Sequence, residues 1–332
     1  MNQQAQTTPS RADAPVLSIV IPMKDEAGSL PALFGRLLPV LQGLGESFEV
    51  VCVDDGSTDA TLSDLRAMLS ASPWLRVVEL SRCFGKEAAL TAGLAHSRGQ
   101  AVVPLDADLQ DPPELIEKFV NVWRDGAEVA YGVRQDRTTD HPAKRFTARL
   151  FYRLINRLSV IPIPRDVGDF RLMDRRVVDA VLDLPERTRF MKGLFAWVGF
   201  RQVAVPYTRE ARAAGRSKFR PWRLWNFALE GIAAFSTAPL RIWTYVGLGV
   251  SALAIAYASI LILRTIIYGR DVPGYASLMV VVLVLGGIQL ITLGVLGEYL
   301  GRIFEETKRR PLYVVRAEHG AAATAPAGPE TS

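Results

Sequence analysis

Leu105-Asp106-Ala107-Asp108-Leu109-Gln110-Asp111-Pro112-Pro113 is the stretch that best indicates how this chain folds. The apolar run 101–105 is suited to a buried strand, and the two prolines after it are typical of the first turn of a helix. In an extended segment residues i and i+2 point the same way, so Asp106 and Asp108 can direct two carboxylates at one point, with Gln110 in reach. These oxygens predict a site for Mg²⁺ or Mn²⁺, which would suit a diphosphate leaving group. A solvated acidic loop is the alternative, because Asp-x-Asp alone is a weak pattern.

Strand-like and helix-like segments alternate on both sides of this stretch. Strand-like runs cover 17–21, 49–53, 76–80, 101–105 and 128–131, and helix-like runs cover 30–41, 60–69, 86–95 and 113–124. This alternation predicts an α/β fold with a mostly parallel, doubly wound sheet. Polar residues 1–15 predict a disordered leader without a signal core, and the sequence from about Ala317 predicts a disordered tail.

Acidic residues follow the first two predicted strands as well. The first strand ends in Pro22-Met23-Lys24-Asp25-Glu26 and the second in Asp54-Asp55-Gly56-Ser57-Thr58-Asp59. Carboxylates at this sheet edge can accept hydrogen bonds from a nucleobase and from ribose hydroxyls. Helix capping explains Ser57, Thr58 and Asp59 equally well. The dinucleotide pattern G-x-G-x-x-G is absent from the first strand, which argues against an NAD or FAD enzyme.

Two long uncharged stretches near the carboxyl end predict membrane spans. They contain 22 residues between Arg241 and Arg264 and 26 between Asp271 and Glu298, more than the ~18–20 that a bilayer requires. Lys and Arg are concentrated on the outer flanks, so we expect a two-helix hairpin, 241–264 and 275–298, with both flanks and the tail 299–332 cytoplasmic. The net charge of +5 is better explained by anionic lipid than by nucleic acid. Cys52 and Cys83 then lie in a reducing compartment, where no disulfide is expected.

Two further segments have the pattern of helices that lie in the membrane interface. Arginines recur every four residues at Arg145, Arg149, Arg153 and Arg157, beside a stripe of leucines, which predicts an amphipathic helix over 143–159. A solvated face on an ordinary core helix is the alternative. A second interfacial helix is expected over 221–238, where Trp222 and Trp225 suit headgroup depth.

Taken together, the motifs of this chain resemble those of one enzyme family. The resemblance rests on the segments 22–26, 54–59, 84–87, 106–112, 167–173, 189–193, 197–199, 214–219 and 296–302, together with the two uncharged stretches. They are similar to the motifs of family-2, inverting glycosyltransferases with a GT-A (Rossmann-like) fold, and most similar to those of polyprenyl-phosphate glycosyltransferases of the bactoprenol (undecaprenyl-phosphate) glucosyltransferase type. Cys83 departs from the pattern, because the family commonly has Asn there.

The resemblance implies a cytosolic catalytic domain over 16–220, in a multi-pass protein of the bacterial inner membrane. It implies transfer of a sugar, glucose from UDP-glucose, to undecaprenyl or another polyprenyl phosphate, for cell-envelope glycans such as O-antigen. The other donors that we consider are GDP-mannose and a UDP-amino sugar. A non-catalytic nucleotide-sugar-binding partner of a flippase and a processive polysaccharide synthase are the rival functions. The sequence leaves the oligomeric state open, including a homo-oligomer.

The resemblance also implies roles for individual residues. The expected metal ligands are Asp106, Asp108 and Gln110, the expected donor-binding residues are Pro22, Asp25, Glu26, Asp54, Lys86, Asp106, Arg216 and Lys218, and the expected lipid-phosphate-binding residues are Arg134, Arg145 and Arg149. Asp108 and Asp169 are the expected catalytic residues. Because an acceptor phosphate is already ionised at neutral pH, Asp169 is expected to orient substrate, with a general base role as the alternative. For Arg216 and Lys218, attraction to anionic headgroups is an equal alternative to closure over the diphosphate.

Overall fold

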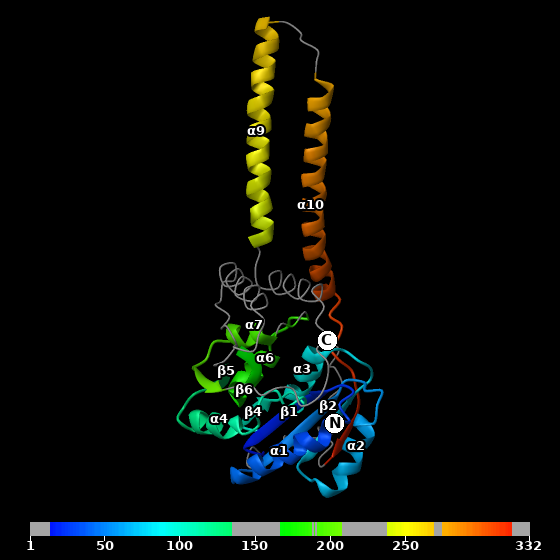
Figure 1. Cartoon of the computed structure of the whole chain (residues 1–332), viewed down its shortest axis with the longest axis vertical. Coiled ribbons are helices and arrows are strands. Elements are labelled where there is room, and N and C mark those ends of the chain that lie inside the picture. The colour runs from blue at the N-terminus through cyan, green and yellow to red at the C-terminus, as the bar shows by residue number, and fades with distance from the viewer. Residues whose placement is uncertain are drawn as a thin grey trace, which may run out of the picture. The chain divides into compact units, whose positions relative to one another are not determined.

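The computed structural model describes residues 14–134, 167–187, 189, 191–207, 238–268 and 274–320 (Figure 1). The chain divides into two compact units. The first comprises 1–152, 161–219 and 311–332, and the second comprises 153–160 and 220–310. The predicted leader up to residue 13 and the predicted interfacial helix 143–159 lie outside the described residues, as does the second interfacial helix except for its last residue.

Within the described residues, the first unit is built on an eight-stranded sheet in the order β7-β5-β6-β4-β1-β2-β3-β8. The strands are β1 (Leu17–Met23), β2 (Phe48–Asp54), β3 (Leu75–Leu80), β4 (Ala101–Pro104), β5 (Val129–Arg134), β6 (Val167–Asp174), β7 (Gln202–Tyr207) and β8 (Val315–Gly320). The central strands β3, β2, β1 and β4 are parallel, whereas β8 and β6 run antiparallel to their neighbours β3 and β4. The carboxyl ends of four strands therefore meet at one edge of the sheet.

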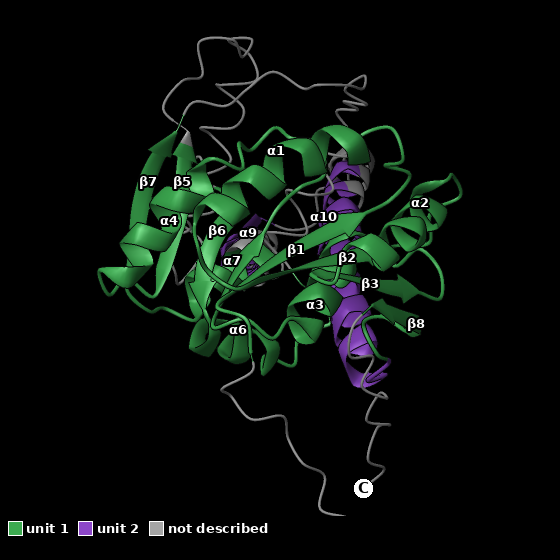
Figure 2. Cartoon of the chain, turned by 90° about the horizontal axis from the view of Figure 1, so that it is seen from below, with its two compact units in different colours: residues 1–152, 161–219, 311–332 green, residues 153–160, 220–310 purple. Residues whose placement is uncertain are grey.

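Helices cover both faces of this sheet (Figure 2). They are α1 (Leu30–Gly43), α2 (Thr61–Met68), the 3₁₀ turn Leu69–Ala71, α3 (Lys86–His96), α4 (Leu115–Arg124), α6 (Arg175–Leu182) and α7 (Met191–Trp197). Apolar side chains of α1, α2 and α4, such as Leu33, Leu65 and Phe119, share one core with Ile19 and Val50 of the sheet. The opposite face carries α3, which lies so close to β1 that a Cβ on Gly93 would lie 2.2 Å from Val20 Cγ1.

The structure agrees with the predicted α/β fold. Each of the five predicted strands and four predicted helices overlaps an observed one, because all nine have a strong apolar pattern and clear turn signals. The sequence of Gly168 to Arg171, a glycine with two charged residues, is typical of a turn, but these residues lie inside β6. The expected disordered tail from Ala317 is wrong for residues 317–320, which pair with β3 as part of β8.

The second unit contains two long helices, α9 (Ala238–Tyr268) and α10 (Tyr275–Thr307). Among the described residues, Val280–Thr307 is the segment long and apolar enough to cross a membrane, with a mean hydropathy of 2.4, and α9 contains a shorter apolar stretch, Tyr245–Tyr257. Large apolar side chains on both helices are exposed, as the 75% exposure of Ile266 and the 71% exposure of Leu290 illustrate. A hairpin with two membrane spans stays a prediction.

Candidate active site

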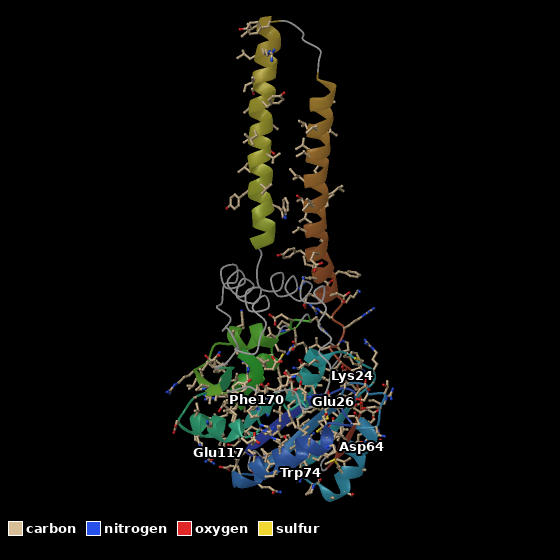
Figure 3. The ribbon with its side chains drawn as sticks, in the orientation of Figure 1. Lys24, Glu26, Asp64, Trp74, Glu117 and Phe170 are labelled. Atoms are coloured by element: carbon tan, nitrogen blue, oxygen red, sulfur yellow. The ribbon has the colours of Figure 1, made fainter. Side chains whose placement is uncertain are left out.

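A pocket of about 300 Å³ lies where the carboxyl ends of the parallel strands meet. It is lined by Pro22, Met23, Lys24, Glu26, Asp55, Cys83, Gly85, Lys86, Ala89, Asp106, Ala107 and Asp108. Figure 3 labels Lys24 and Glu26, which follow β1 on the pocket side, and Trp74, which precedes β3 and lies on the other side of the domain. This location agrees with the rule that open α/β sheets bind ligands beyond the carboxyl ends of their strands.

Lys86, the first residue of α3, joins two carboxylates at this pocket. Its Nζ lies 2.8 Å from both carboxylate oxygens of Asp106 and 3.1 Å from Oδ2 of Asp169. β4 and β6 pair antiparallel, Ala101 with Asp174 and Val102 with Met173, so the chain that leaves β4 toward Asp106 runs in the direction of the start of β6, where Asp169 lies. The expected catalytic residue Asp169 and the expected ligand Asp106 are therefore brought together by strand pairing, with Lys86 between them.

The charges around Lys86 shift the pKa values of the group. Burial raises the pKa of Asp106, the carboxylates of Asp169 and Asp111 act in the same direction, and Lys86 offsets part of the effect. Burial alone would lower the pKa of Lys86, but attraction to Asp106 and Asp169 outweighs it, so the pKa is raised. The Asp106 side chain is 37% exposed at the pocket wall, and burial of the rest of it is the main cause of its raised pKa. Lys86 therefore keeps its positive charge at neutral pH, facing the pocket.

Asp106 and Asp108 both line the pocket, as the Asp-x-Asp spacing predicts. Gln110 is 4% exposed and is not among the lining residues, and its backbone N–H donates to Asp108 Oδ1 at 3.2 Å. In the described part of the chain, no three His, Cys, Asp or Glu side chains are grouped as a metal site. Two carboxylates still fit Mg²⁺ or Mn²⁺, because such ions are commonly held by one or two carboxylates and the substrate's phosphates.

Asp55 is a pocket residue that sequence reasoning passed over in favour of Asp54. Its carboxylate accepts from the backbone N–H groups of Phe84 at 2.6 Å and Gly85 at 2.9 Å, and from the Cys83 thiol at 3.2 Å. These bonds fix the loop before Lys86 on the pocket wall. The departure from the family pattern at Cys83 therefore still places a hydrogen-bond donor, the thiol, on Asp55. Alternation along β2 could have distinguished the two acids, since Asp54 shares the face of the core residues Val50 and Cys52.

The residues at the end of β1 and directly after it either line the pocket or support its rim. Pro22 and Glu26 line the pocket, whereas Asp25 is not among the lining residues and accepts from the Thr58 backbone N–H at 2.7 Å. This hydrogen bond lowers the pKa of Asp25. Asp25 also has a φ of 55°, a conformation rarely adopted by residues other than glycine. Asp54 is buried at 1% exposure, and its Oδ2 accepts from the Ser57 backbone N–H at 3.3 Å.

Arg171, two residues after Asp169 on β6, is a buried cation next to the site. It is 3% exposed, its Nη2 donates to the Gly168 carbonyl at 3.0 Å, and its guanidinium lies 4.0 Å from the centre of the Phe195 ring on α7. Burial lowers the pKa of Arg171 to about 10, while the Asp169 carboxylate acts in the opposite direction. Arg171 therefore remains a cation at neutral pH and supports the charge of Asp169.

The remaining predicted site residues lie at the limits of the described chain. Arg134 is the last residue of β5 and pairs with Tyr207, and its side chain is not described. Arg145, Arg149, Arg216 and Lys218 lie outside the described residues. Their assigned roles stay predictions.

Comparison with known proteins agrees with this fold and pocket. Residues 18–182 match the family described as Glycosyl transferase family 2, and residues 238–303 match the GtrB C-terminal hairpin. An uncharacterized glycosyltransferase of Synechocystis sp. is 57% identical over 299 residues, which are 90% of this chain and 94% of that protein. This chain belongs to glycosyl transferase family 2. It is therefore an enzyme that transfers a sugar.

Several relatives of this family-2 chain carry a more specific name. The bactoprenol glucosyl transferase of Shigella phage SfII is 46% identical over 303 residues, which are 91% of this chain and 98% of that protein. A prophage bactoprenol glucosyl transferase homolog of Escherichia coli is 47% identical over 300 residues, or 90% and 98% of the two chains. Among solved structures, the mannosyltransferase PcManGT from Pyrobaculum calidifontis, in complex with GDP-Man and Mn²⁺, aligns with a TM-score of 0.46 at 19% identity, covering 92% of this chain and 87% of that chain.

Proposed function

We propose that this glycosyltransferase moves glucose from UDP-glucose to undecaprenyl phosphate, with inversion at the sugar carbon, on the cytoplasmic face of the membrane. The observation that carries the proposal is the pocket lined by Lys86, Asp106 and Asp108, in which Lys86 contacts Asp106 and also reaches Asp169 next to the pocket. The choice of donor and acceptor is supported by relatives that are named bactoprenol glucosyl transferases and align over 98% of their length.

The pocket has the chemistry that a nucleoside diphosphate sugar requires. Lys86 supplies a positive charge that its two carboxylate partners keep protonated, and such a charge favours binding of a diphosphate. Asp106 and Asp108 would hold Mg²⁺ or Mn²⁺, with Gln110 as an outer support through its backbone contact with Asp108. When bound, the ion would neutralise charge that develops on the leaving diphosphate. Glu26 and Asp55, which line the pocket after β1 and β2, would face the nucleoside.

Asp169 would act on the acceptor side of the same pocket. A phosphate monoester has its second pKa near about 6 and is already a nucleophile at neutral pH, so a strong base is not needed. Held by Lys86 at 3.1 Å and next to buried Arg171, the Asp169 carboxylate would orient the acceptor or the sugar hydroxyls. The predicted lipid-phosphate-binding residues Arg134, Arg145 and Arg149 would supply the cationic groups that an anionic lipid needs.

The proposal is tested by transfer of radiolabel to undecaprenyl phosphate by the purified full-length protein. The donors are UDP-glucose, UDP-galactose, UDP-N-acetylglucosamine and GDP-mannose, each with Mg²⁺, with Mn²⁺ and with a chelator. We expect a metal-dependent lipid product from UDP-glucose. A product from another donor alone would show that the enzyme transfers that sugar and not glucose. Binding of a donor without any product would instead indicate a nucleotide-sugar-binding partner of a flippase.

A further inference from the structure

The carboxyl-terminal strand β8 holds the first residue of the loop that leads into the pocket. The backbone N–H of Ser81, directly after β3, donates to the carbonyl of Val314 at 2.8 Å. The Ser81 carbonyl accepts from Nη2 of Arg316 on β8 at 3.0 Å. Both backbone hydrogen-bonding groups of Ser81 are therefore bound by the carboxyl-terminal segment.

Buried acids fix the position of β8 along β3. Glu79, which is 4% exposed, lies 2.6 Å from Arg66, 3.3 Å from Arg316 and 3.4 Å from His319. On the opposite face of the strands, Glu318 lies 3.4 Å from Arg76 and 3.3 Å from His96. A strand that pairs its charges on both faces has a specified register, because a shift by one residue would exchange the two faces.

The last residue of β8 adds a steric constraint to these charge pairs. Gly320 has a φ of 115°, and a Cβ there would lie 2.5 Å from the Leu75 carbonyl oxygen. Only glycine fits this close approach of the two backbones, so the end of β8 is matched to the start of β3.

The loop that begins at Ser81 is held at its other end by the site itself. It contains Cys83 and Gly85, which line the pocket, and it leads directly into Lys86. Asp55 accepts the backbone N–H groups of Phe84 and Gly85, and Gly56 lies so close that a Cβ there would be 2.7 Å from the Cys83 nitrogen. The loop is thus fixed at two points, by β8 at Ser81 and by Asp55 at residues 84 and 85.

We propose that β8 is a positioning element of the donor site, with Arg316 as its main positioning residue. By fixing Ser81, Arg316 sets the path of the loop and the place of Lys86, although no residue of β8 is among the described residues that line the pocket. Arg316 therefore acts mainly on affinity for the nucleotide-sugar donor, because the loop lines the pocket, and reaches the acceptor side only through the contact of Lys86 with Asp169. This inference rests on the proposed function, because it takes the pocket to be the donor site.

The test compares Arg316→Ala with two other variants of the full-length protein. Arg316→Lys keeps a positive charge near Glu79 and one donor for Ser81. Arg310→Ala removes the same charge from the exposed segment between α10 and β8. We expect Arg316→Ala to raise the KM for UDP-glucose by about 3- to 10-fold, which is the size of one lost charge-assisted hydrogen bond, and to change the KM for undecaprenyl phosphate by a smaller factor. Arg316→Lys should recover most of this loss, and Arg310→Ala should resemble the wild type.

Hydrogen exchange and calorimetry separate positioning from a general loss of stability. In Arg316→Ala the peptide that contains Ser81 and Lys86 should exchange faster, and the dissociation constant of UDP-glucose with Mg²⁺ should rise by the same factor as KM. If Arg316→Ala had the same KM and dissociation constant for UDP-glucose as Arg310→Ala, the inference would be overturned whether or not hydrogen exchange changes. An equal rise in the KM for UDP-glucose and for undecaprenyl phosphate would overturn it as well. If the wild type bound no nucleotide sugar, the proposed function and this inference would both fall, whereas a wild type that binds normally isolates the failure to β8.

Discussion

At the scale of single residues, the site depends on which of two adjacent acids faces the pocket. Asp106 and Asp108 could be predicted from sequence because their spacing of two places both on one side of an extended chain. Asp54 and Asp55 could not be separated by residue type, but alternation along β2 places Asp54 on the core face with Val50 and Cys52, and Asp55 lines the pocket. Gln110 was predicted as a ligand from spacing, but its side chain is buried and is not among the lining residues.

Replacement of Asp55 tests the support of the loop before Lys86. In Asp55→Ala the backbone N–H groups of Phe84 and Gly85 lose their acceptor, which costs about 1–3 kcal/mol at a partly buried site. We expect the KM for UDP-glucose to rise on the order of 10-fold, measured by initial rates of lipid glucosylation. Asp55→Asn keeps one acceptor oxygen, so its KM for UDP-glucose should lie between those of Asp55→Ala and the wild type. An unchanged donor KM in Asp55→Ala would show that the loop is held without these bonds.

Glu49 gives a pH dependence of stability that is separate from the active site. It is 3% exposed and accepts from the Ser18 hydroxyl at 2.6 Å and the Arg98 backbone N–H at 2.6 Å, while Arg76 lies 3.3 Å away. Burial alone would raise the pKa of Glu49, but these hydrogen bonds and charges outweigh it and lower the pKa. Because the folded-state pKa is below the unfolded value, the stabilisation is present above the unfolded value and is lost as pH falls through the folded value.

We therefore expect Glu49→Gln to reduce the free energy of unfolding by about 1–3 kcal/mol at pH 7, the cost of weakening a buried charged hydrogen-bond network. The difference between variant and wild type should shrink below the ordinary glutamate pKa of 4.5. Denaturant unfolding at a series of pH values measures it. A difference that stays constant down to the acid limit of folding would refute the role of ionised Glu49.

At the scale of elements, local sequence predicts the parallel core and does not predict the strands that join it from far along the chain. The predicted strands and helices up to residue 134 are apolar runs between clear turn signals. In contrast, β6 contains Asp169 and Arg171 and resembles a polar turn, yet it is a strand because it pairs with both β4 and β5. Likewise, β8 has the mixed sequence VRAEHG, and it forms because Arg316, Glu318 and His319 find charged partners more than two hundred residues away.

Glycine substitutions test how closely α3 must lie on the sheet. A Cβ on Gly93 would lie 2.2 Å from Val20 Cγ1 and 3.0 Å from Val53 Cγ2, so Gly93→Ala forces both valines to move. We expect a loss of about 1–3 kcal/mol in unfolding free energy, the usual cost of overpacking a core. Gly35→Ala is the matched control, because Gly35 also lies inside a helix but faces open space. It should raise stability by about 0.5–1 kcal/mol, and equal effects of the two variants would contradict the packing argument.

At the scale of the whole molecule, the chain consists of a catalytic unit and a helical unit that includes α9 and α10. The two long uncharged stretches of the sequence predict both helices, and the match to the GtrB C-terminal hairpin covers residues 238–303. Composition alone marks only Val280–Thr307 as a span among the described residues, since the apolar stretch of α9 is shorter.

Thiol labelling tests the predicted topology, in which both flanks are cytoplasmic and the connection between the helices is outside. Cys83 is exposed in the catalytic unit, whereas Cys52 is buried and its burial raises the pKa of its thiol, so Cys52 should not react. In right-side-out membrane vesicles, an impermeant maleimide should label Gly274→Cys in a Cys83→Ala background. The native chain should be labelled only after the vesicles are opened. Labelling of the native chain in sealed vesicles, or none of Gly274→Cys, would contradict the two-span arrangement.

The measurement that tests the central claim most directly is the yield of lipid-linked glucose from Asp108→Asn beside the wild type. Both proteins should be inserted in membranes at matched amounts and supplied with UDP-glucose, undecaprenyl phosphate and Mg²⁺ or Mn²⁺. Because Asp108 lines the pocket and is one of the two carboxylates proposed to hold the ion, its neutral isostere should reduce product formation by at least about 100-fold while insertion and folding stay intact. Retained turnover in Asp108→Asn would contradict the assignment of this pocket as the metal-dependent transfer site.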